Sequence, residues 1–249
     1  MNRKQRRAQG QLGPQLRAAS RPAAAIVEWF NAALAHQHAG RGAQAERICH
    51  NILSVDPGHA RALHLLGLIE HQSGRSDEAI EHIHMAIMRN GQDAAFHHNL
   101  GNILRTRERA IEAVTCYERA LALAPGSVDT LYNLGCCCQD LGQPKRAIGY
   151  FERALRLRPD AIELHNNLGS ALQDLGRLGE AIACYRKALA LQPDAVEALD
   201  NLAGALRFTN HARRRVWIAH QLTGHELKRT GLAQQNMFGE VDNAHAAAA

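Results

Sequence analysis

Apolar residues recur at three- and four-residue steps through most of this chain. Leu131, Leu134 and Cys138 form one such set. This spacing places side chains on one face of an α-helix. The hydrophobic pattern therefore predicts a series of amphipathic helices.

The helical pattern itself repeats every 34 residues. Three series keep this step: alanine from Ala45 to Ala181, proline or glycine from Pro57 to Pro193, and a small residue from Ala33 to Ala203. Independent series with one period indicate a stack of one supersecondary unit. With position 1 at Ile26, the full units are 26–59, 60–93, 94–127, 128–161 and 162–195, and a partial unit covers 196–208.

Each unit predicts an antiparallel pair of helices. Glycine at position 15, as in Gly142, supplies the left-handed residue that ends the first helix. Proline at position 32, as in Pro159, cannot continue the second helix. Small residues at positions 8, 20 and 27 let the helices approach, and large residues at positions 7, 24 and 28 fill the core. Glu108 and Gly91 depart from this template.

These positions resemble the tetratricopeptide repeat, a helix–turn–helix unit of the same length. The resemblance implies an all-α, right-handed superhelical solenoid of antiparallel helix pairs. The motif Asn-Leu-Gly occurs at 99–101, 133–135 and 167–169. With this motif the repeats resemble more specifically those in the arm of O-linked N-acetylglucosamine transferases and their bacterial relatives. In that family an asparagine ladder holds the acceptor polypeptide, and a separate domain performs the chemistry.

Charge separates the repeats from the two ends. The net charge of +5 comes from the ends, whereas residues 22–206 are mildly acidic. We expect residues 1–25 to be a basic, disordered arm, 209–230 a divergent basic capping helix, and 231–249 a disordered tail. After Phe208 the template is lost, and the sequence leaves open a divergent cap or a truncated or frame-altered copy of a longer protein.

Several classes of function find no support in the sequence. The six cysteines include no Cys-x-x-Cys pair, and we interpret them as small apolar residues in a reducing compartment. No nucleophile motif, phosphate-binding loop or nucleic-acid module is visible, and no apolar run would span a bilayer. We therefore expect a cytoplasmic non-enzyme without cofactor, metal, nucleic-acid or membrane partner; the oligomeric state stays open.

The candidate binding residues lie on the first helix of each repeat. Position 6 reads Asn31, Leu65, Asn99, Asn133, Asn167 and Asn201. Asparagine is a poor interior helix residue, but its amide offers two donors and an acceptor. A row of such amides can pair with the backbone of an extended peptide; the alternative is that each asparagine ties helix to helix. Position 5 adds His64, His98, Tyr132, Asn166 and Asp200 to the predicted concave groove.

The groove residues also predict the kind of partner. Positions 2 and 5 contain no lysine, which argues against a clamp for a terminal carboxylate. Carboxylates such as Asp129, Glu163 and Glu197 gather toward the C-terminal half and favour a basic segment. We expect a protein-interaction scaffold; the alternative is the substrate-recruiting arm of a glycosyltransferase or methyltransferase whose catalytic domain is missing.

Overall fold

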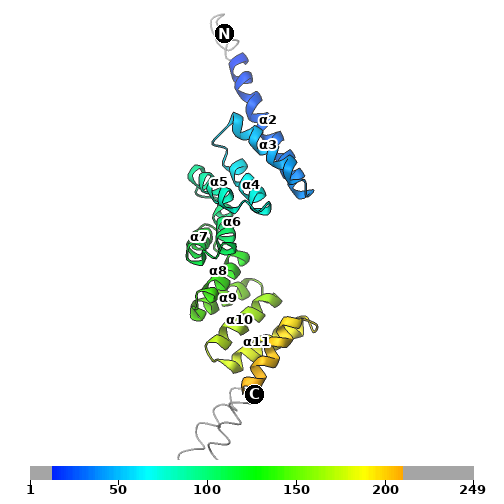
Figure 1. The fold of residues 1–249 in the computed structure, drawn as a ribbon, viewed down its shortest axis with the longest axis vertical. Coiled ribbons are helices and arrows are strands. Elements are labelled where there is room, and N and C mark those ends of the chain that lie inside the picture. Colours follow the sequence, from blue (N-terminus) through cyan, green and yellow to red (C-terminus); the bar gives the residue numbers. More distant parts are fainter. Residues whose placement is uncertain (1–12, 210–249) are drawn as a thin grey trace, which may run out of the picture. The chain divides into compact units, whose positions relative to one another are not determined.

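The computed structural model describes residues 13–209, and side chains from residue 24 onward. Every regular element in this part of the chain is an α-helix (Figure 1). The chain divides after residue 159 into two units, of which the structure describes residues 13–159 and 160–209. None of the helices within 13–209 has the length and apolar character that crossing a bilayer requires.

The first unit holds four helix pairs. They are α2 (Gly13–His38) with α3 (Gly42–Val55), α4 (Ala60–Gln72) with α5 (Ser76–Arg89), α6 (Ala94–Thr106) with α7 (Ala110–Leu123), and α8 (Val128–Asp140) with α9 (Pro144–Leu157). The helices of each pair pack together, and each first helix also contacts the first helix of the next pair. The first helices α2, α4, α6 and α8 therefore line up along one side of this unit.

The second unit contains α10 (Ile162–Asp174), α11 (Leu178–Leu191) and a further helix over residues 196–209. Within the pair, α10 packs against α11. The all-α arrangement of helix pairs agrees with the fold class that the sequence predicts.

The helices end where the repeat template predicts. Position 15 has a positive φ throughout, from 66° at Gly142 to 84° at Gly74, and Glu108 adopts 60° despite its side chain. Each second helix ends two residues before position 32, even before Gly91, where proline is missing. The turn geometry therefore belongs to the repeat as a whole and tolerates both departures.

Close packing within each pair depends on the glycine at position 8. A Cβ atom on Gly101 would lie 2.7 Å from Tyr117, and one on Gly169 would lie 2.5 Å from Tyr185. Gly135 faces Phe151 in the same way. The three aromatic rings are almost completely buried. This confirms the predicted contact between small residues at position 8 and aromatic residues at position 24.

The N-terminal helix begins earlier than the repeat template. Helix α2 starts at Gly13, so residues 13–25 are helical, whereas the sequence analysis expects an arm that extends to residue 25. Five alanines in 18–25 explain this, because alanine is the best helix former and needs no repeat contact. The expectations for residues 1–12, for all but the first residue of the capping helix at 209–230, and for the tail at 231–249 lie outside the described residues.

The polar row of the first helices as a candidate binding site

The predicted site residues all lie on first helices. We call them, together with Asn102, the polar row: Asn31 on α2, His64 on α4, His98, Asn99 and Asn102 on α6, Tyr132 and Asn133 on α8, Asn166 and Asn167 on α10, and Asp200 and Asn201 on the helix 196–209. Asn31 and Asp200 are exposed, Asn166 is buried, and the others are partly buried. Amides and imidazoles dominate the row, so its chemistry is hydrogen bonding.

One tie in the row joins α4 and α6. The amide nitrogen of Asn99 lies 2.9 Å from Nε2 of His64, which belongs to the preceding repeat. Because an amide nitrogen only donates, the imidazole must accept through an unprotonated Nε2. The His64 ring also stacks near Phe96, with 4.5 Å between ring centroids. The position of the Asn99 amide is therefore fixed by the neighbouring repeat.

A second tie joins α6 and α8. The side-chain oxygen of Asn102 accepts from the hydroxyl of Tyr117 at 2.7 Å and from the amide of Asn133 at 2.9 Å. Tyr117 is the same buried aromatic residue that packs on Gly101. The core aromatic residue of one repeat thus orients the ladder asparagine of the next.

The second unit repeats the arrangement with different residues. Asn201 donates its amide to the side-chain oxygen of Asn166 at 2.9 Å. Asn166 occupies the repeat position of His64, and Asn201 that of Asn99. Two chemically different acceptors therefore serve the same role, and only one of them titrates.

The remaining predicted residues are not joined into one ladder by these contacts. His98 lies 2.9 Å from the hydroxyl of Thr130 on α8, through Nδ1. Asn31 stands exposed near the start of the repeats, where the neighbouring position-6 residue is Leu65. Tyr132, Asn167 and Asp200 lie on the same helices as the tied residues.

Burial keeps the two histidines of the row neutral at pH 7. It lowers the pKa of His64 from 6.5 to about 4, against a smaller opposing effect of Asp93. Burial also lowers the pKa of His98, with Asp129 acting in the opposite direction. In the first unit the row thus presents uncharged donors and acceptors.

Sequence reasoning missed Asn102. Position 9 shows no constancy, since it reads Leu34, Leu68, Asn102, Cys136 and Ser170. The available signal was the three-residue step from Asn99 to Asn102, which places both amides on one helix face. Such a step is common by chance, so the structure was needed to identify this residue.

Burial favours the protonated form of several cysteines. Burial raises the pKa values of Cys49 and Cys137 to about 12 and that of Cys116 to about 11, which keeps them as thiols. Within residues 13–209, no three histidine, cysteine or acidic side chains gather closely enough to hold a metal ion.

Family models for the tetratricopeptide repeat match residues 37–103, 92–160, 139–196 and 166–207. The matches overlap and run from residue 37 to residue 207 without a gap. The chain belongs to the tetratricopeptide-repeat family. The description is that of the repeat in general, so the narrower resemblance to the transferase arm stays a prediction. No curated protein matches the chain in sequence.

Solved tetratricopeptide-repeat structures share the fold. The chain matches MamA with a TM-score of 0.61 and 25% identity, over 64% of this chain and 92% of MamA. It matches YrrB, a TPR protein with an unusual peptide-binding site, with a TM-score of 0.64 and 20% identity, over 72% of this chain and 96% of YrrB. At these identities the likeness concerns the fold.

Proposed function

We propose that this chain is a protein-interaction scaffold that binds extended partner segments along the polar-row residues of each unit. The observation that carries this proposal is the set of inter-repeat ties at Asn99, Asn133 and Asn201. Each tie fixes a side-chain amide at one position per repeat. A receptor with fixed donors and acceptors loses less side-chain entropy when it binds.

The tied amides keep hydrogen-bonding capacity. Each donates one N–H to the neighbouring repeat and retains a second N–H and a carbonyl oxygen. Within residues 24–209, the side-chain oxygens of Asn99 and Asn133 accept no hydrogen bond from the chain. These groups match the alternating N–H and C=O groups of a peptide backbone, so recognition would depend little on the partner's sequence. Each asparagine can therefore serve both roles: one N–H bonds to the neighbouring repeat, and the remaining N–H and carbonyl oxygen bind the partner.

The fold neighbour YrrB supports the class of partner, because its peptide-binding site is carried by the same repeat fold. Charge then suggests different preferences along the chain. The first unit offers a neutral row, whereas exposed Glu163, Glu197 and Asp200 of the second unit favour a basic segment. We propose that the chain itself is cytoplasmic and performs no catalysis, and that its partner is a protein or peptide and neither a nucleic acid nor a membrane.

A quadruple alanine variant tests the proposal. We expect N99A/N133A/N167A/N201A to weaken partner binding by about 2–6 kcal/mol. Each neutral hydrogen bond contributes about 0.5–1.5 kcal/mol, and the contributions add because the four sites are separate. Partner recovery from lysate, identified by mass spectrometry, is the measurement, with circular dichroism to verify folding.

The matched control is Arg146→Ala. It removes an inter-repeat ion pair of 2.9 Å with Glu118 on the second helices and leaves the polar row intact. The control should recover the wild-type partners. Identical recovery by the folded quadruple variant would contradict the proposal.

The transferase-arm alternative predicts the same polar row. The Asn-Leu-Gly phrases at 99–101, 133–135 and 167–169 favour it. It differs in requiring a catalytic glycosyltransferase or methyltransferase domain. The coding sequence downstream of this chain, translated in all three frames, discriminates the two.

A further inference from the structure

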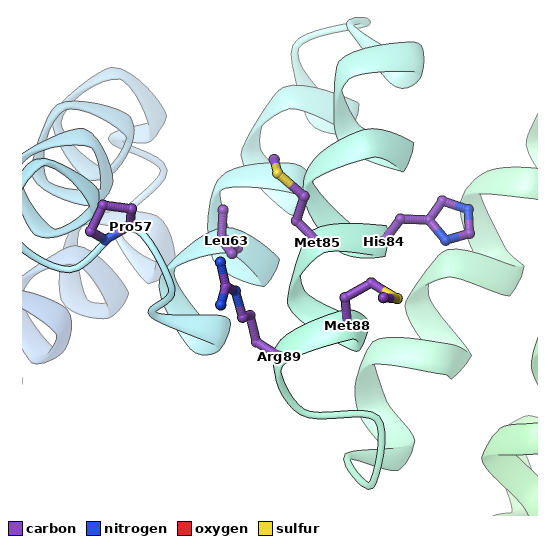
Figure 2. A pocket seen from close by; sticks show the side chains of 6 residues that line it. All are labelled: Pro57, Leu63, His84, Met85, Met88 and Arg89. Atoms are coloured by element: carbon purple, nitrogen blue, oxygen red, sulfur yellow. The ribbon is translucent and has the colours of Figure 1, made fainter.

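A cavity of about 390 Å³ opens between α4 and α5 of the first unit (Figure 2). It is lined by Pro57 from the preceding turn, Leu63 from α4, and His84, Met85, Met88 and Arg89 from α5. None of these residues belongs to the polar row. The volume suits one or two large apolar side chains.

The apolar lining is an exception among the repeats. Met85 and Met88 are 45% and 85% exposed. The equivalent residues are Asn51 and Ser54 on α3, Arg119 and Ala122 on α7, and Arg153 and Arg156 on α9. The fold therefore does not require apolar side chains at these positions. Methionine is flexible and suits surfaces that adapt to a partner.

The base of the cavity is part of the core. Leu63 is only 4% exposed and packs in a buried cluster with Ala86 and Phe96. An apolar side chain that enters the cavity would extend this cluster and cover the two methionines. Such burial contributes favourable free energy in proportion to the area covered.

The cavity lining carries one guanidinium, that of Arg89, and the carboxylate of Asp56 lies near it. Arg89 forms no ion pair within residues 24–209. The nearby carboxylate of Asp56 caps the backbone N–H of Gly58 at 3.1 Å. A partner segment with a carboxylate next to its apolar side chain would satisfy this guanidinium.

We propose that this cavity is a second docking site, separate from the polar row, for a protein segment that presents a Leu, Met or Phe side chain flanked by Asp or Glu. The segment inserts its apolar side chain into the cavity that Leu63, Met85 and Met88 line. Its carboxylate pairs with Arg89. The scaffold could then hold two partner segments at once.

Methionine methyl signals report directly on this site, because the chain has only four methionines. The probe is a set of synthetic twelve-residue peptides with a central Leu, Met or Phe flanked by glutamates, and a copy with lysines instead. We expect the glutamate peptides to shift the ¹³C-methyl signals of Met85 and Met88, while those of Met1 and Met237 stay constant. No shift at millimolar peptide, or equal shifts with the lysine copy, would overturn the proposal.

Two variants sharpen the test. M85R/M88R installs the residues that α9 carries at 153 and 156, so the fold should accept them, and peptide affinity measured by fluorescence anisotropy should fall at least about tenfold. Arg89→Glu should reverse the preference toward the lysine copy. The N99A/N133A variant should still bind the peptides, which separates this site from the polar row. Concentration-dependent methionine shifts without peptide would show that a second copy of the chain covers the cavity, and would overturn the assignment.

Discussion

At the residue scale, one glycine sets how closely each helix pair packs. We expect Gly135→Ala to lower the free energy of unfolding by about 1–3 kcal/mol, because its Cβ would overlap the fully buried ring of Phe151. The matched control is Gly149→Ala on α9, where no heavy atom lies within 4 Å of the added Cβ. The free energy of unfolding of this control should rise by about 0.5–1 kcal/mol, because alanine is a better helix former than glycine. Urea unfolding followed by circular dichroism measures both; equal effects would contradict the packing.

His64 makes stability depend on pH. Its pKa is about 4 in the folded chain and 6.5 as the ordinary value, so the unfolded chain binds more protons between these limits. The free energy of unfolding should therefore fall as the pH falls from about 6.5 toward 4, by on the order of 1–3 kcal/mol from this group.

The structure supplies the matched variant for this pH effect. His64→Asn copies Asn166, which accepts from Asn201 as His64 accepts from Asn99. Between pH 7 and pH 4.5, the free energy of unfolding measured with denaturant should fall less for this variant than for the wild type. Parallel losses would mean that His64 does not carry the effect.

Single residues differ in how well the sequence predicts them. The position-8 glycines and the ladder asparagines follow from the 34-residue step, because the same packing or bonding problem recurs in every repeat. Asn102 and Thr130 act in one repeat only, so no periodic signal could identify them.

At the element scale, the turn between α6 and α7 carries local strain. Glu108 has a φ of 60°, where its four counterparts are glycine. A left-handed conformation costs a non-glycine residue about 1–2 kcal/mol, and glycine's extra unfolded-state freedom offsets about 0.5–1 kcal/mol of the gain. We expect Glu108→Gly to stabilise the chain by up to about 1 kcal/mol in thermal unfolding. Gly74→Glu is the reciprocal control and should destabilise it.

The ends of the helices were predictable to the extent that the repeat sets them. Helices α4 to α11 end at their position-15 and position-32 turns. The start of α2 was not, because the alanine-rich stretch before Ile26 is helical through intrinsic propensity and lies outside the 34-residue template. The sequence analysis also did not predict the cavity beside α5, because Met85 and Met88 interrupt no motif and their exposure is known only from the structure.

At the scale of the whole molecule, the stack of helix pairs followed from periodicity, because each repeat buries its core only against its neighbours. The family followed from the resemblance of the residues at positions 8, 20, 24, 27 and 32 to the tetratricopeptide repeat. Function did not follow in the same way. Asn99, Asn133 and Asn201 each donate one N–H to an adjacent repeat and keep a second N–H, and the sequence does not show how structure and binding share these groups.

Site-specific photo-cross-linking tests the central claim most directly. Benzoylphenylalanine replaces Tyr132 on α8, in the polar row, or Tyr150 on α9, a second-helix tyrosine whose hydroxyl lies 3.4 Å from Glu118. Both changes exchange one aromatic residue for another, so both proteins should fold. We expect the partner to cross-link to position 132 and not to position 150. Cross-links at position 150 with none at position 132 would place the partner on the second helices and contradict the account.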